Sequence, residues 1–167
     1  VGCVWSVSVL TRFFFWSRRR ISWRKKHNGR VYDSVEGHKK VCVLVVLGSG
    51  GHTAEMLMLL GDMDLRSKVS LSCVLANTDR FSRDKALEAF SRSLDVGKHE
   101  VEDYVDFHII RRSREVGQSY LSSVLTTLVS FYDSLVLLAQ SRVDMILVNG
   151  PGTCIPICFA SMCLEVS

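Results

Sequence analysis

The hydrophobic pattern of the chain changes its period several times and predicts alternating strands and helices. Short apolar runs rich in Val, Ile and Leu are typical of buried strands, and they cover residues 41–47, 71–77, 105–110 and 144–148. Helices are predicted in the intervening and following segments, over residues 53–60, 81–90, 118–140 and 154–164. This order predicts an α/β fold with a Rossmann-like parallel sheet of strand order 3-2-1-4.

The longest predicted helix is amphipathic. Its apolar positions recur at helical spacing, at Leu121, Val124, Leu125, Leu128, Phe131, Tyr132, Leu135 and Leu138. Its other side carries Ser122, Thr126, Ser130 and Asp133. We expect the apolar stripe to pack on the sheet, because an amphipathic face is the ordinary condition of a surface helix. A helix lying on a membrane is the alternative.

A glycine turn follows the first strand. Gly48, Gly50 and Gly51 allow a sharp turn and a close approach of the backbone to a ligand, and a helix begins directly after them. The free N–H groups of such a helix favour an anion, most often a phosphate; the alternative is a tight turn that binds nothing. No Lys-Ser/Thr pair follows, and Thr53 stands where a dinucleotide fingerprint has its third glycine. The turn is therefore neither a Walker loop nor a good dinucleotide motif.

Two further loops should lie beside this turn, because the carboxyl ends of parallel strands meet at one edge of a sheet. One loop contains residues 111–115, Arg-Arg-Ser-Arg-Glu, and the other contains residues 149–153, Asn-Gly-Pro-Gly-Thr. Glycine N–H groups and guanidinium groups suit a diphosphate, whereas hydroxyls and an amide suit a sugar or a nucleotide. His52, at the mouth of the helix, is a candidate general base or a hydrogen-bonding support.

Composition adds an N-terminal segment of different character. Residues 1–40 carry ten Lys and Arg against two acids, a net charge of +8, whereas the remaining chain carries 11 basic and 15 acidic residues, a net charge of −4. The apolar start, its Trp residues and the basic residues that follow predict a membrane anchor over residues 1–26, with a linker over residues 27–40 and one domain over residues 41–167.

The anchor has several alternatives. It is short for a span and contains Arg12, so a truncated span and a helix lying in the interface both stay open. A disordered basic arm or an untranslated sequence would also have this composition. Nucleic-acid binding is not expected, because no recognition fold accompanies the basic run.

The six cysteines show no disulfide framework, and five lie in apolar runs. We expect them to be reduced, buried thiols of a domain that faces the cytosol. Cys154, Cys158 and Cys163 share one predicted helix, but their spacing does not suit a metal site.

Residues 46–55, 76–79, 112–116 and 148–158 together resemble the asparagine-linked glycosylation protein 14 family, and the similarity covers roughly residues 41–162. The resemblance implies the acceptor-side half of a split GT-B glycosyltransferase. Such a subunit is anchored on the cytosolic face of the endoplasmic reticulum membrane, or in the nuclear envelope. It recruits a soluble catalytic subunit, asparagine-linked glycosylation protein 13, which carries most of the site for UDP-N-acetylglucosamine (UDP-GlcNAc).

The resemblance also implies a reaction and a set of site residues. The two subunits add the second GlcNAc to GlcNAc-diphospho-dolichol with inversion of the anomeric centre, and neither a metal nor another cofactor is implied. The candidate catalytic residue is His52. The candidate acceptor-binding residues are Gly48, Ser49, Gly50, Gly51, Thr53, Arg112, Arg114, Glu115, Asn149, Gly150, Gly152 and Thr153. Glu115 has the alternative role of a surface ion-pair partner for Arg111 or Arg112.

This sequence departs from the family at its C-terminus. Family members continue with further strands and a segment that docks the partner, whereas this sequence ends at Ser167. A fragment, a splice form and an incomplete gene model all fit, and we expect exposed apolar surface, marginal stability and no activity of the isolated chain. The alternatives to an enzyme subunit are a non-enzymatic membrane adaptor, an inert isoform, and a nucleotide-binding oxidoreductase.

Overall fold

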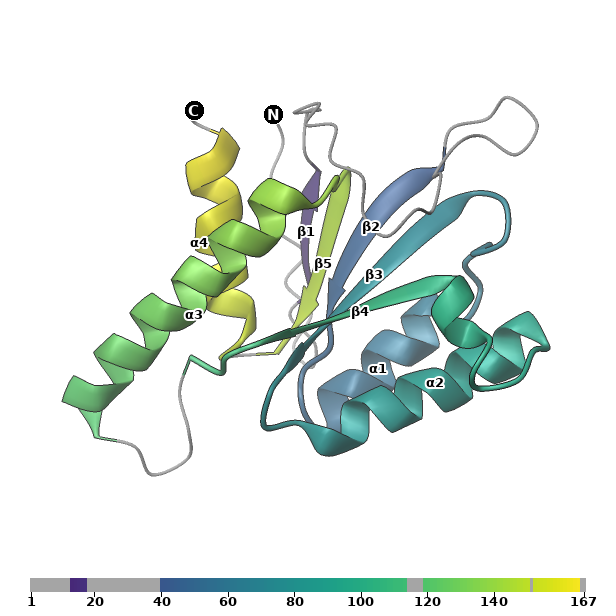
Figure 1. Cartoon of the computed structure of the whole chain (residues 1–167), viewed down its shortest axis with the longest axis horizontal. Helices are drawn as coiled ribbons and strands as arrows, with labels where there is room; N and C mark the ends of the chain where they lie inside the picture. Colours follow the sequence, from purple (N-terminus) through teal and green to yellow (C-terminus); the bar gives the residue numbers. More distant parts are fainter. Residues whose placement is uncertain (1–12, 18–39, 114–118, 151, 166–167) are drawn as a thin grey trace.

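The computed structural model describes residues 13–17, 40–113, 119–150 and 152–165. Strands and helices alternate along the chain, with helices on both sides of one twisted sheet (Figure 1). The elements are β1 (Phe13–Ser17), β2 (Val41–Val46), α1 (Gly51–Leu60), β3 (Val69–Ala76), α2 (Arg80–Leu94), the 3-10 helix η1 (Val101–Asp103), β4 (Val105–Ile110), α3 (Tyr120–Gln140), β5 (Met145–Asn149) and α4 (Cys154–Glu165).

The sheet confirms the predicted topology. Its order is β1-β5-β2-β3-β4, and β5, β2, β3 and β4 are parallel. Counted along the chain from β2, these strands have the order 3-2-1-4. The protein is therefore an α/β Rossmann-like domain, and the three candidate loops leave the same edge of the sheet.

The strand β1 was not expected from the sequence. It pairs antiparallel with β5, with Phe13 opposite Asn149 and Ser17 opposite Met145. The chain thus enters β1 at the carboxyl edge of the parallel strands. The rest of the predicted anchor, residues 1–12 and 18–26, lies outside the described residues, so the anchor stays a prediction.

Successive side chains of the central strand β2 point to opposite faces of the sheet. They pack in two separate cores, because helices cover both faces. On one face, Val43 and Val45 pack with residues of α1 and α2. On the other face, Leu44 and Val46 pack with residues of α3 and α4. The continuous apolar run predicted as a buried strand is thereby explained.

The segment of residues 91–103, which follows the helix predicted over residues 81–90, is largely regular structure. The helix α2 continues to Leu94 and ends where Asp95 adopts a left-handed conformation, with φ of 51°. Its start is capped by Asp79, whose side chain accepts a hydrogen bond from the Ser82 N–H. The last turn of α2 was not predicted, because the polar residues on its outward side interrupt the hydrophobic pattern.

The orientation predicted for α3 is wrong over much of its length. Leu125 and Leu128 are 68% and 58% exposed, whereas Ser130 and Ser134 are fully buried. This helix packs along α4, which already covers that face of the sheet with side chains such as Ile157. Small hydroxyl residues allow the two helices to approach closely, so the apolar stripe turns outward. Only its C-terminal part, such as Leu138, joins the core.

The cysteines only partly match the expected burial. Cys73 and Cys154 are buried, but Cys163 is exposed. Burial raises the pKa of Cys154 to about 12, and burial together with the nearby Asp144 raises the pKa of Cys42 to about 11. These thiols are protonated at neutral pH and are poor nucleophiles.

Candidate functional site

The first glycine turn requires its glycines for two different reasons. A side chain at Gly48 would place its Cβ 2.8 Å from the Asn149 carbonyl oxygen and 3.0 Å from the His52 Cβ. Gly50 has a φ of 69°, which a β-branched residue adopts only under strain. No other atom lies within 4 Å of a Cβ built at Gly50 or Gly51, so this stretch of backbone is open to a ligand.

Two buried hydroxyls hold this turn in place. The Thr53 hydroxyl donates to the Gly48 carbonyl oxygen and lies 2.7 Å from the Ser82 hydroxyl. Ser82 also donates to the Asp79 carboxylate at 2.6 Å. Thr53 is fully buried, so its side chain supports the turn from within, although the sequence placed it among the ligand contacts.

A carboxylate that the sequence analysis did not select connects the two glycine turns. Glu55 Oε2 lies 3.6 Å from His52 Nδ1 and accepts a hydrogen bond from Asn149 Nδ2 at 2.9 Å. The same amide donates to the His52 carbonyl oxygen at 3.3 Å. Glu55 lies three residues after His52 on α1, and this spacing places both side chains on one side of the helix. That spacing is the sequence signal that could have identified Glu55.

The network leaves His52 with one nitrogen free for chemistry. Its Nδ1 faces Glu55, and its side chain is 46% exposed. A carboxylate beside Nδ1 favours a ring orientation in which the opposite nitrogen, Nε2, points away from Glu55. Asn149 is 2% exposed and therefore positions this pair from beneath.

The second glycine turn contacts the same imidazole. A Cβ built at Gly150, where φ is 109°, would lie 3.0 Å from the His52 Cδ2. Gly152, with φ of 76°, lies beside the third loop, because a Cβ built there would be 4.0 Å from Ser113 Oγ. Thr153 is 6% exposed and faces the interior. The three loops expected at this edge are thus in contact.

The arginine loop is only partly described. Arg111 pairs with Asp133 of α3, with its Nε 3.0 Å from Oδ2. The Arg112 N–H approaches Asn77 Oδ1 at 3.4 Å. Arg114 and Glu115 lie outside the described residues, and their proposed roles stay predictions.

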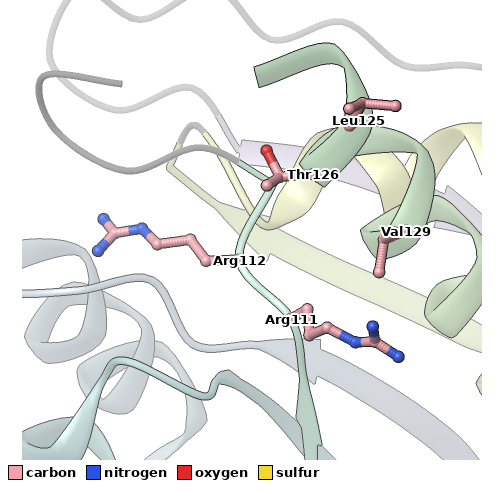
Figure 2. A pocket seen from close by; sticks show the side chains of 5 residues that line it. All are labelled: Arg111, Arg112, Leu125, Thr126 and Val129. Carbon is pink, nitrogen blue, oxygen red and sulfur yellow. The ribbon is translucent and has the colours of Figure 1, made fainter. Parts of the chain in front are cut away.

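Two hollows lie beside this loop rather than over the glycine turns. The smaller, of about 220 Å³, lies between the arginine loop and α3 (Figure 2). Arg111 and Arg112 extend to opposite sides of the backbone there, below Leu125, Thr126 and Val129. A second hollow of about 480 Å³ separates β4 from α3 and includes Tyr132. Ser49 and Gly50 are exposed and line neither hollow.

The fold and the residues at the carboxyl edge of the sheet define the class of protein. A Rossmann-like sheet carries two glycine turns, a helix N-terminus and an oriented imidazole at the carboxyl ends of its strands, which is where such domains bind nucleotides, sugars and phosphates. None of the described residues form a group of His, Cys, Asp and Glu suited to a metal ion.

Comparison with known proteins identifies the family. The sequence model of the family described as "Oligosaccharide biosynthesis protein Alg14 like" matches residues 43–167. This chain belongs to that family. The chain is similar to the UDP-N-acetylglucosamine transferase subunit ALG14 of Mus musculus, with 42% identity over 74% of this chain and 57% of the relative. Identity to the Homo sapiens protein of the same name is 40% over 79% of this chain and 61% of the relative.

A more distant relative gives the same result. The Candida albicans UDP-N-acetylglucosamine transferase subunit ALG14 is 38% identical over 78% of this chain and 57% of its own length. The chain thus spans roughly three fifths of the relatives it matches. No solved structure matches it.

Proposed function

We propose that this chain is the acceptor-binding, membrane-anchoring part of a two-chain glycosyltransferase that transfers GlcNAc from UDP-GlcNAc to GlcNAc-diphospho-dolichol. Family membership supports the transferase role, because the relatives are named as subunits of a UDP-N-acetylglucosamine transferase. The observation that carries the proposal is the contact of both glycine turns with His52. A diphosphate fits the open N–H groups at Gly50 and Gly51.

The chemistry assigned to this chain is proton removal from the acceptor. As the acceptor hydroxyl oxygen attacks the anomeric carbon of GlcNAc, the bond from that carbon to UDP breaks with inversion. His52 Nε2 takes the hydroxyl proton, and Glu55 stabilises the imidazolium that forms. UDP leaves with the electron pair of the broken bond. The donor lies mainly on a soluble catalytic subunit, asparagine-linked glycosylation protein 13, which this chain recruits to the cytosolic face of the endoplasmic reticulum membrane.

Gly50→Val tests the diphosphate cradle. The substitution forces a β-branched residue into a φ of 69° on the open surface, so KM for the lipid-linked acceptor should rise while KM for UDP-GlcNAc stays nearly constant. Transfer is measured with the soluble catalytic subunit and this chain extended by the C-terminal part of the Mus musculus relative. Gly61→Val is the control, because Gly61 ends the same helix with an ordinary φ of −59°. A folded Gly50→Val subunit with normal acceptor KM would overturn the cradle.

His52→Ala tests the base. If His52 takes the proton, kcat should fall by roughly 10²–10⁴ with a smaller change in KM. Glu55→Gln should lower kcat less, because the neutral amide still orients the ring but stabilises its charged form poorly. A rise in acceptor KM at constant kcat would instead assign His52 to binding. If the extended chain recruits the catalytic subunit but supports no transfer in any form, the adaptor alternative replaces the enzyme subunit.

A further inference from the structure

The hydroxyl of Ser82, in the first turn of α2, reaches across to the first glycine turn. This side chain is 2% exposed and lies between α2 and the start of α1. Its Oγ lies 2.6 Å from Asp79 Oδ2, 2.7 Å from Thr53 Oγ1 and 3.2 Å from the Gly48 carbonyl oxygen. Thr53 is fully buried as well. The network therefore joins the start of α2 to the carbonyl group with which the glycine turn opens.

Two hydroxyl protons are available for the oxygens of this network. The Ser82 hydroxyl donates to the Asp79 carboxylate, which is the stronger acceptor and lies at the shorter distance. The Thr53 hydroxyl donates to the Gly48 carbonyl oxygen. Asp79 therefore fixes the position of Ser82, and the contact of the two hydroxyls fixes the position of Thr53. The geometry of the glycine turn depends in this way on a helix that follows a different strand.

The two helices that begin at this edge, α1 and α2, differ in how their starts are capped. Asp79 accepts the Ser82 N–H with one carboxylate oxygen at 3.1 Å and the Ser82 hydroxyl with the other at 2.6 Å. A carboxylate thus occupies the start of α2 and would repel an anion there. The start of α1 has Gly50 at the capping position and receives no side-chain cap from the described residues. An anion at this edge is therefore directed to α1, beside the turn that Ser82 supports.

The short loop between β3 and α2 also contacts the arginine loop on its other side. The backbone N–H of Asn77 donates to the Ile110 carbonyl oxygen at 2.9 Å. The side-chain oxygen of Asn77 accepts from the Arg112 N–H at 3.4 Å. Since β3 lies between β2 and β4 in the sheet, residues 77–79 join the glycine turn to the start of the arginine loop. This loop therefore helps to set where the N–H groups of the turn lie relative to Arg112.

We infer that Ser82, oriented by Asp79, is a positioning residue for the diphosphate of the acceptor. Its hydroxyl is buried beneath the turn and acts through Thr53 and the Gly48 carbonyl oxygen on the open N–H groups that follow. On its other side the turn is packed against the second glycine turn, since a Cβ built at Gly48 would lie 2.8 Å from the Asn149 carbonyl oxygen. The hydroxyls and the second turn thus hold the first turn from two sides.

The inference rests on the proposed function, because it takes the first glycine turn as the diphosphate site. Ser82→Ala is made in the chain extended by the C-terminal part of the Mus musculus relative and assembled with the soluble catalytic subunit. KM for the lipid-linked acceptor should rise by about five- to tenfold, the size expected for one lost hydrogen bond. The change in kcat should be smaller, and KM for UDP-GlcNAc should stay constant. A hydroxyl that only stabilised the fold would change the amount of folded protein and neither KM value.

Ser91→Ala is the matched control on the same helix. The Ser91 hydroxyl also donates to a backbone carbonyl oxygen, that of Val96 at 2.6 Å, but it lies at the far end of α2. This variant should leave both KM values unchanged.

Two variants of Thr53 follow the network to the turn. Thr53→Val keeps the shape of the side chain and removes its hydroxyl, so it should raise the acceptor KM as Ser82→Ala does. Thr53→Ser keeps the hydroxyl and should restore most of the acceptor affinity. Ser82→Ala combined with Thr53→Val should have little more effect than either alone, because both act through one carbonyl oxygen.

Inorganic pyrophosphate tests the inference without transfer. Its binding to the extended chain is measured by isothermal titration calorimetry, and Ser82→Ala should weaken it by a similar factor, whereas Ser91→Ala should not. Absence of transfer by the unaltered complex would contradict the proposed function, and the pyrophosphate affinities alone would then decide the role of Ser82.

Two results would overturn the inference. One is an unchanged acceptor KM and an unchanged pyrophosphate affinity in a folded Ser82→Ala chain, which would leave the proposed function standing if Gly50→Val still raised the acceptor KM. The other is an equal loss of affinity in Ser82→Ala and Ser91→Ala, because the two hydroxyls would then act only through the stability of α2.

Discussion

The two long helices on opposite faces of the sheet, α2 and α3, present reversed surfaces. In α2, Phe90 is buried, while charged side chains such as Glu88 face outward. In α3, Ser130 is buried, while Leu128 faces outward. Figure 1 shows the two helices on separate sides of the same sheet. One layer therefore has the surface of an ordinary soluble domain and the other does not.

This difference shows what a periodic pattern can establish. Helical spacing of apolar residues correctly located α3 and its length, because the spacing depends on the helix alone. It did not determine what the stripe faces, since that depends on α4, whose Ile157 and Ala160 occupy the sheet surface first. The rule that an apolar stripe faces the core assumes that water is the only other neighbour.

Alanine truncation should separate the two layers most strongly. Phe90→Ala removes a side chain that is 2% exposed and should lower the free energy of unfolding by about 3–5 kcal/mol. Leu128→Ala, at an exposed position, should change it by about 0.5 kcal/mol or less. Urea unfolding of the chain in detergent-free buffer measures both. Similar costs for the two variants would show that Leu128 is covered and would remove the contrast.

The sheet was predictable because its information is local. Each strand is a short apolar run followed by glycine or polar residues, and right-handed crossovers leave few topologies for such a sequence. The pairing of β1 with β5 was not predictable in this way, because Phe13–Ser17 lies in an apolar segment without alternation or turn signals. A short edge strand inside such a segment forms because it pairs with a neighbouring strand, and its own sequence pattern does not predict it.

The candidate site was predictable in its loops but not in its connections. Gly48, Gly50 and His52 were selected from one contiguous motif. The spacing of Glu55 from His52 is a local signal, but the hydrogen bond of Glu55 with Asn149 joins residues 94 positions apart, so no local pattern reveals that connection. Thr53 shows the converse, since a hydroxyl beside a glycine turn suits a ligand and an internal support equally well.

Alkaline pH should test whether the two cores are equally dry. Cys73 lies in the core beside α2 and Cys154 in the core beside α4, and burial is the main cause that raises the pKa of both thiols, that of Cys154 to about 12. Thiols in the unfolded chain lose their protons at about pH 8.5. The stability that each buried thiol contributes is therefore complete below that pH, and it is lost as pH rises toward the pKa of the thiol in the folded state. Each thiol should lower the free energy of unfolding by up to about 1.4 kcal/mol per pH unit in that window.

Urea unfolding at several pH values checks this prediction with single variants. Cys73→Ala and Cys154→Ala should each flatten the alkaline decline by a similar amount. The exposed Cys163 provides the control, since Cys163→Ala removes a thiol without changing either core. A flattening confined to Cys73→Ala would show that water reaches the core beneath α3 and α4.

A small effect should come from the serines between α3 and α4. The Ser130 hydroxyl is buried and makes no hydrogen bond with any described residue, so Ser130→Ala removes an unsatisfied group and should stabilise the chain by about 0.5–1 kcal/mol. Ser134→Ala is the matched control, because that hydroxyl donates to the Ser130 carbonyl oxygen at 2.7 Å. Its loss should offset the gain in helix propensity and leave stability nearly unchanged. If both variants gave equal gains, the hydroxyls would be equivalent. If Ser130→Ala destabilised the chain, the inner side of α3 would depend on a polar contact at Ser130, and the assignment of its packing to small size alone would be wrong.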